Sequence, residues 1–144
     1  MEVKQKWIEQ LQLNGFQIAE ALHFCAGKES IYRTVLETAL EEGRQKLPLL
    51  KRLGEEQYLD RYYIEVHGLK NAAQTIGAAR LFELAKQQCE RCKMLQDRTE
   101  VEETGTETGQ GRKEVEIEPA GLNEMLLEYG RVLQQIETAE LDME

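Results

Sequence analysis

The sequence predicts an all-α protein, and three observations support this prediction. Glu, Gln, Leu, Ala, Lys and Arg, all good helix formers, recur along the 144 residues. Only two residues are proline. Apolar residues recur every three or four positions over most of the chain. The length fits one domain with one core, so we divide a single domain, 1–144, into N-terminal helices (1–27), core helices (28–97), an acidic loop (98–118) and a C-terminal helix (119–142).

Two short helices are expected before residue 28. The first, 4–13, ends at Asn14-Gly15, and the second, 16–25, ends at Ala26-Gly27, because glycine commonly terminates a helix. Their regularly spaced apolar residues are Trp7, Ile8, Leu11, Ile18, Ala21, Leu22 and Cys25. We expect Trp7 to anchor one end of the core.

A longer helix is expected from Glu29 to Leu53. Its inward positions are Ile31, Val35, Leu36, Leu40, Leu47, Leu50 and Leu53. Pro48 should kink or split this helix, because proline lacks the N–H of the helical hydrogen bond and clashes with the preceding turn. Gly54 is expected to mark a short reversal of the chain.

Three further helices complete the prediction. The first, 55–76, can be capped by Gly77. The second, 78–97, carries one stripe made of Leu81, Leu84, Ala85, Gln88, Cys92 and Leu95. The last, 119–140, starts at Pro119 and carries Leu122, Met125, Leu126, Tyr129, Leu133 and Ile136. Four substantial helices with mostly short connections predict an antiparallel four-helix bundle.

The segment 98–118 is rich in Glu, Thr and Gly, which is typical of a mobile loop. A small β-hairpin is the alternative, because Val101, Val115 and Ile117 alternate with charged residues.

Charge and composition exclude several function classes. The net charge of −9 disfavours nucleic acid as a partner, because phosphate backbones repel an acidic surface. No apolar run approaches the roughly 20 residues of a membrane span, and the amphipathic N-terminus is unlike a secretory signal. Three cysteines do not make a disulfide framework, so we expect a cytoplasmic protein.

The helix 55–76 contains the most informative residue, His67. An α-helix turns about 100° per residue. On that geometry a core stripe forms from Leu59, Tyr62, Val66, Leu69, Ala73 and Ile76. His67, Lys70, Asn71 and Gln74 fall on a second arc that faces solvent, with Tyr63 and Ile64 one turn earlier. An exposed Ile64 and the small residues Gly68 and Ala72 favour a surface on which a partner docks.

These residues can support phosphoryl transfer. An exposed imidazole is a competent nucleophile at neutral pH. Lys70 lies one turn from His67, where its charge could stabilise a transferring phosphoryl group. A surface histidine followed by lysine three residues later is also common without any function.

The segment from His67 to Gly77, HGLKNAAQTIG, resembles the signature of histidine phosphotransfer (HPt) domains, which reads H-x-L-K-G-S/A-A-x-x-I/V/L-G. The stretch IAEALHFCAGKESIY, from Ile18 to Tyr32, resembles the start of that family's domain. LFELAK, from Leu81 to Lys86, resembles the helix that follows the histidine. The resemblance covers about residues 15–97 well and the C-terminal helix in outline.

The resemblance implies a four-helix bundle that accepts a phosphoryl group on His67 from a receiver-domain aspartate and passes it to another receiver. Lys70 matches the family lysine, and Gln74 could orient the phosphoryl group. Tyr63, Ile64 and Gly68 would help to dock the receiver of a response regulator or hybrid histidine kinase. The receiver would supply Mg²⁺, so the protein needs no cofactor of its own and is a carrier more than an enzyme. We expect a monomer.

One position departs from the family pattern. Asn71 stands where the family has glycine, and its amide could either obstruct the phosphoryl group or donate a hydrogen bond to it. Asn71 therefore keeps open an alternative of another class, a helical bundle that binds a receiver or a partner helix without chemistry. The sequence has no glycine-rich phosphate loop or other nucleotide-binding motif.

A zinc site is the rival interpretation of the cysteines. Cys89 and Cys92 have C-x-x-C spacing, and His23 and Cys25 could complete four ligands. Cys25 and Cys92 also fit core positions, and cysteines are commonly buried as small apolar residues. We therefore expect core cysteines and no metal.

Overall fold

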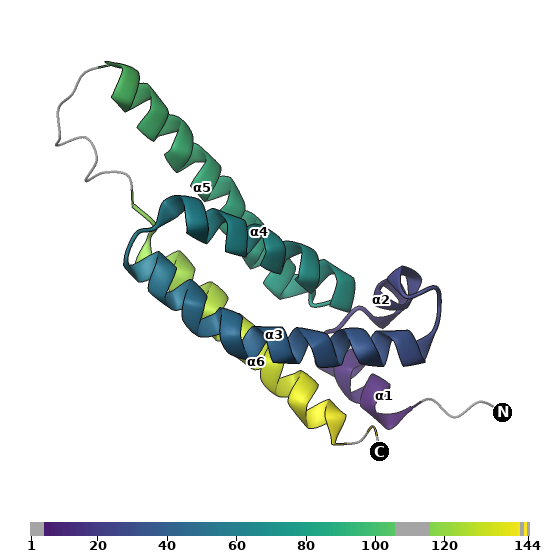
Figure 1. The fold of residues 1–144 in the computed structure, drawn as a ribbon. Coiled ribbons are helices and arrows are strands. Elements are labelled where there is room, and N and C mark those ends of the chain that lie inside the picture. Colours follow the sequence, from purple (N-terminus) through teal and green to yellow (C-terminus); the bar gives the residue numbers. More distant parts are fainter. Residues whose placement is uncertain (1–4, 106–115, 142, 144) are drawn as a thin grey trace.

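The computed structural model describes residues 5–105, 116–141 and 143, and over these residues the protein is all-helical, with no strand (Figure 1). The helices are α1 (Lys6–Leu13), α2 (Ile18–Phe24), α3 (Glu29–Glu55), α4 (Leu59–Ile76), α5 (Ala79–Gly105) and α6 (Pro119–Glu140). The expected all-α class is therefore confirmed for the described part of the chain. No helix in that part is long and apolar enough to cross a membrane.

The four long helices pack against one another in a closed order. α3 contacts α4, α4 contacts α5, α5 contacts α6, and α6 contacts α3. The short helices α1 and α2 lie at one end of this group, where α1 packs on α6 and α2 packs on α4 and α3 (Figure 1). This arrangement leaves one side of α4 free for the residues around His67.

The apolar stripes meet in one core. All of the expected stripe residues of α1 and most of those on the other helices are buried. Trp7 is 4 % exposed, and its ring centroid lies 6.0 Å from that of Tyr32. The expectation that Trp7 anchors the core is confirmed.

The start of α3 corrects one expectation. Ile31 is 42 % exposed, so its inward placement is wrong, and the neighbouring Tyr32 is completely buried instead. The ring of Tyr32 packs on Trp7, and its hydroxyl group reaches the backbone of α4. These two contacts fix the rotation of α3, because the larger side chain can fill the space between three helices.

The rest of α3 decides one expectation and corrects another. The helix continues unbroken past Pro48, so the alternative of a split is excluded and the alternative of a kink is left. Pro48 is exposed, so water can reach the carbonyl group that has lost its partner. Gly54 is a buried helical residue rather than the site of the reversal. A Cβ atom there would lie 2.6 Å from Leu122 Cδ2, so glycine allows α3 and α6 to approach closely.

The segment 98–118 differs most from expectation. Residues 98–105 extend α5, so a loop starting at 98 is wrong, and so is a hairpin strand at Val101. The cause is helix propagation. Once α5 has formed, extending it by one more Arg or Glu costs little free energy. Val115 lies outside the described residues. Ile117 is 3 % exposed and packs into the core just before α6.

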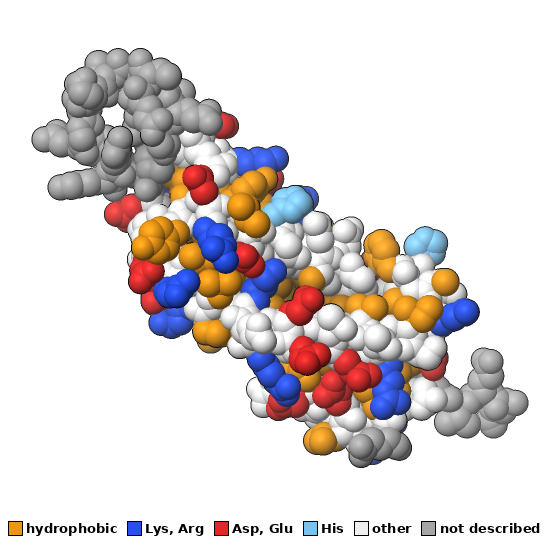
Figure 2. Space-filling view, in the orientation of Figure 1, with side chains coloured by type: hydrophobic (Ala, Val, Ile, Leu, Met, Phe, Trp, Pro, Cys, Tyr) orange, Lys and Arg blue, Asp and Glu red, His pale blue; other side chains and the backbone are white. Residues whose placement is uncertain are grey.

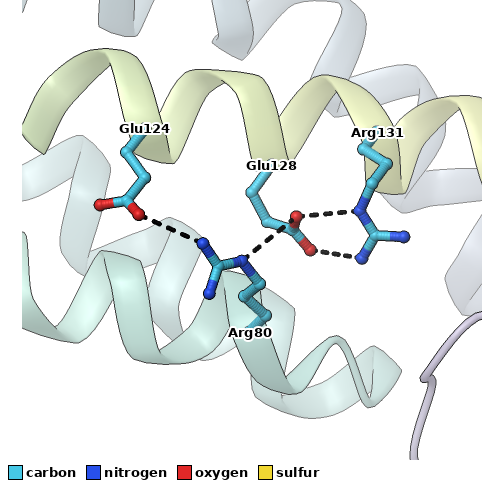
Figure 3. Close-up of polar contacts among 4 residues, drawn as sticks. All are labelled: Arg80, Glu124, Glu128 and Arg131. Atoms are coloured by element: carbon cyan, nitrogen blue, oxygen red, sulfur yellow. Dashed lines mark hydrogen bonds and ion pairs between the residues drawn. The ribbon is translucent and has the colours of Figure 1, made fainter.

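One ion-pair network joins α5 to α6 (Figure 3). The carboxylate of Glu128 is buried, with a side chain 8 % exposed, and Arg131 Nε donates to its Oε1 across 2.9 Å. Arg80 Nε lies 3.7 Å from the same oxygen, and Arg80 Nη2 lies 3.2 Å from Glu124. Among the described residues, Glu128 is the one charged residue that is buried, and the two guanidinium groups compensate its negative charge.

Candidate functional site

The site is built on α4, whose C-terminal end is fixed by Gly77. This glycine has a left-handed φ of 84°. Ala78 N–H donates to the Ala73 carbonyl group at 2.9 Å, and Gly77 N–H donates to that of Gln74 at 3.2 Å, which is the Schellman arrangement. A Cβ atom on Gly77 would lie 2.7 Å from the Gln17 carbonyl oxygen, so only glycine fits. The expected cap is confirmed, and it also joins α4 to the start of α2.

The helical geometry predicted for α4 is confirmed. The stripe residues Tyr62, Val66, Leu69, Ala73 and Ile76 are all buried. His67, Asn71 and Gln74 are exposed, and Lys70 is half-buried. The imidazole of His67 is therefore accessible to a macromolecular partner.

Tyr63 and Ile64 border the histidine on the preceding turn. Tyr63 is half-buried, and its ring centroid lies 6.0 Å from that of His67 in an edge-on orientation. Ile64 is 62 % exposed. An aromatic ring beside the imidazole and an exposed aliphatic side chain next to it give a partner an apolar contact.

Lys70 and Gln74 lie toward α5 and α2. The positive charge of Lys70 acts to lower the pKa of the Cys89 thiol on α5, although burial is the larger effect and raises that pKa overall. Gln74 lines a hollow of about 290 Å³ between α2, α4 and α5, together with Gln17, Glu20, Gly77, Phe82 and Glu83. Gln74 is two turns from His67, so it reaches only the outer part of a group bound there.

Lys46 on α3, which no sequence pattern singled out, contacts the turn of α4 that carries His67. Its Nζ donates to the Glu65 carbonyl oxygen at 3.3 Å and is 3.6 Å from Glu65 Oε1. It would also lie 3.1 Å from a Cβ atom on Gly68. Lys46 therefore occupies part of the space that Gly68 leaves open, which was expected to remain free for a partner. No local pattern could have revealed this, because the contact joins two helices.

The surface around the site is mixed in character. Both histidine side chains are visible on the face drawn in Figure 2, where apolar, basic and acidic side chains alternate. His23 is exposed beside Phe24, with ring centroids 6.2 Å apart. Charged and apolar side chains both lie on this face, so a partner would be recognised by charge as well as by apolar contact.

The cysteines lie in the core. Cys25, Cys89 and Cys92 are free thiols, all buried. Within the described ranges, no three His, Cys, Asp or Glu side chains come together as metal ligands, so the zinc alternative with His23 is not assembled. Burial raises the pKa of Cys92 to about 12, which keeps it a neutral core thiol at physiological pH.

Comparisons of the chain with protein-family models, with curated proteins and with solved structures found no match.

Proposed function

We propose that the protein is a cytoplasmic phosphorelay carrier that accepts a phosphoryl group on His67 from the aspartate of a receiver domain and passes it to a second receiver. The observation that carries the proposal is the exposed imidazole of His67 on α4, with Lys70 one turn further on, in the segment that resembles the HPt signature. The closed packing order of α3, α4, α5 and α6 supports an antiparallel four-helix bundle as the scaffold.

The transfer step needs only one nucleophilic nitrogen. The lone pair of His67 Nε2, the nitrogen that the resemblance suggests, attacks the phosphorus while Nδ1 keeps its proton. The bond between phosphorus and the aspartyl oxygen breaks, and the aspartate leaves as a free carboxylate. The reverse step on a second receiver regenerates neutral His67. No oxidant or nucleotide is consumed, and the receiver contributes Mg²⁺.

The neighbouring residues have separate roles in this proposal. Lys70 stabilises the phosphoryl charge, because an ammonium group near a transferring phosphoryl group favours the transition state. Asn71 and Gln74 help to orient the phosphoryl group, while Tyr63, Ile64 and Gly68 form the docking surface for the receiver. A monomer suffices, since every one of these groups comes from α4.

The test is transfer of labelled phosphate from a purified receiver domain, phosphorylated on its aspartate, to wild-type protein and to His67→Gln. We expect acid-labile, base-stable label on wild type only, with unchanged helicity in His67→Gln, because His67 lies outside the core. Lack of label on wild type with several competent receivers would contradict the proposal.

A second function is favoured by Asn71, which occupies the position of the family glycine. In that case the same surface binds a receiver or a partner helix without phosphoryl transfer. Stable binding of a receiver domain together with no labelling of His67 would favour it over the carrier.

A further inference from the structure

Lys46 is held against the turn of α4 that carries His67. Of the three donors on its ammonium group, one bonds to the Glu65 carbonyl oxygen at 3.3 Å. The Glu65 carboxylate is 3.6 Å away, which is an ion pair but too long for a hydrogen bond. Glu65 is also shared with Arg61, whose Nε is 3.5 Å from its other oxygen. The ammonium group of Lys46 is therefore fixed in place with donors to spare.

Gly68, the residue after His67, lets this cation lie close to the backbone of α4. Any side chain at position 68 would meet Lys46 Nζ, since a Cβ atom there would already lie 3.1 Å away. The side chain of Lys46 is 22 % exposed, so it is not sealed inside the bundle. A partner that covers both His67 and the neighbouring Gly68 therefore also covers Lys46.

The space beside Lys46 is too small to hold an organic ligand. A cavity of about 50 Å³ lies there, between α3, α4 and α6, with Glu42, Lys46, Gly68, Ala72 and Tyr129 among its lining residues. That volume accommodates water rather than a metabolite. Besides Glu65, the partner that the spare donors of Lys46 can take is accordingly an anionic group on the surface of a docked protein.

We propose that Lys46 is a specificity-determining residue that selects phosphoryl donors with an acidic surface next to the reacting aspartate. This inference rests on the proposed phosphoryl transfer. Lys46 and Lys70 come from different helices: Lys70 is one turn after His67 on α4, and Lys46 on α3 contacts Glu65 and the backbone at Gly68. A donor that covers this turn of α4 meets both cations. Lys70 acts on the phosphoryl group, and Lys46 acts on the encounter with the donor protein.

This division of roles predicts a particular kinetic signature. A charge at the rim of an interface changes the association rate and its salt dependence more than it changes the chemistry. Lys46→Met should therefore lower the second-order transfer rate about fivefold at low ionic strength, with no change in the maximal rate at saturating donor. The difference should shrink at high salt, because screening at 1 M acts within about 3 Å.

The experiment compares Lys46→Met with Lys51→Met, using one purified receiver domain phosphorylated on its aspartate as donor. Lys51 is also on α3 and pairs with Glu55 at 2.8 Å, so both variants lose one lysine ion pair and one positive charge. Lys46→Arg should restore wild-type transfer, since it keeps the charge. Equal rates for Lys46→Met and Lys51→Met would overturn the assignment.

A substitution of Glu65 distinguishes a role of Lys46 in docking from a role of Lys46 in structure. If Lys46 only neutralises Glu65, the double variant Lys46→Met/Glu65→Gln should recover wild-type transfer. We expect instead that the double variant stays about fivefold slower than Glu65→Gln alone, because the cation itself meets the donor. If wild-type protein is not labelled at all, the proposed function fails along with this role; if wild type is labelled and the Lys46 variants match their controls, only the role of Lys46 fails.

Discussion

The hydroxyl group of Tyr32 donates a hydrogen bond of 2.8 Å to the carbonyl oxygen of Ile76, which joins the first turn of α3 to the last turn of α4. Both residues are buried. The bond therefore holds the end of the helix that carries His67, although the two residues are 44 positions apart in sequence.

Tyr32→Phe should lower the free energy of unfolding by about 1–2 kcal/mol, because the substitution leaves the Ile76 carbonyl group buried without a donor. Urea unfolding with an unchanged m-value is the measurement. Tyr58→Phe is the matched control, since Tyr58 is 56 % exposed and should change stability by less than about 0.5 kcal/mol. Equal effects of the two variants on the free energy of unfolding would mean that the hydrogen bond of Tyr32 does not stabilise the fold.

Lys70→Ala should slow phosphoryl transfer at saturating donor by about tenfold or more, because an ammonium group that stabilises developing charge acts on the chemical step. Docking, measured as the affinity for an unphosphorylated receiver domain, should change little. Lys51→Ala controls for the lost charge. A Lys70→Ala variant that transfers as fast as wild type would remove the role assigned to Lys70.

Asn71→Gly tests the position that departs from the HPt pattern. Asn71 is exposed, so its amide can contact the phosphoryl group without crowding His67, and we expect the loss of this minor contact to change transfer rates by no more than about twofold. Glycine inside a helix should cost about 0.5 kcal/mol of stability relative to asparagine. A much larger gain in transfer rate would show that the amide obstructs the phosphoryl group.

Gln57 should stabilise the connection between α3 and α4. Its φ is +60°, and its side chain donates to the carbonyl oxygens of Gly54 at 3.1 Å and Ile117 at 3.2 Å and accepts from Ile117 N–H at 2.7 Å. Gln57→Ala should lower the free energy of unfolding by about 1–3 kcal/mol, and Gln57→Gly by about 1 kcal/mol less, because glycine adopts positive φ without strain. Thermal or urea unfolding of the two variants shows which of them is more stable. A glycine variant less stable than the alanine variant would contradict the prediction.

The buried thiols predict that stability is lost at alkaline pH. Burial raises the pKa of Cys92 from 9.0 to about 12, and burial also raises the pKa values of Cys25 and Cys89. Between pH 9 and pH 12 the unfolded chain has lost the Cys92 proton while the folded chain keeps it. The unfolded state then binds fewer protons, so the free energy of unfolding falls with rising pH, by up to about 1.4 kcal/mol per pH unit for each such thiol.

Urea unfolding of wild type and Cys92→Ala at several pH values from 8.5 to about 10 measures this slope. The alanine variant should be less stable at pH 8 because of the cavity it leaves, yet its stability should fall less steeply with pH. Tyr32 and Tyr129 contribute equally to both proteins and cancel in the comparison. The pKa of Tyr62 is raised by burial and also by the charge of Cys92, so the two slopes are compared below about pH 10, where a tyrosine in the unfolded chain still keeps its proton. Parallel slopes would show that Cys92 titrates alike in the folded and unfolded states.

Helical periodicity determined much of this protein by itself. The all-α class, the buried stripe of α4, the outward position of His67 and the glycine cap at Gly77 all depend on residues within one helix, where spacing fixes direction. The burial of Trp7, Cys25 and Cys92 follows from the same rule. These features could be predicted because neighbours in sequence decide them.

Tertiary contacts decided the rest. The choice of Tyr32 over Ile31 as the inward residue depends on Trp7 and Ile76, which belong to other helices. Gly54 is a packing residue only because Leu122 lies against it, and Lys46 reaches the backbone of α4 only because α3 packs beside Gly68. A helical pattern gives the direction of a side chain about its own axis, but it does not say which side chain of another helix lies opposite, since that depends on how the helices pack as a group.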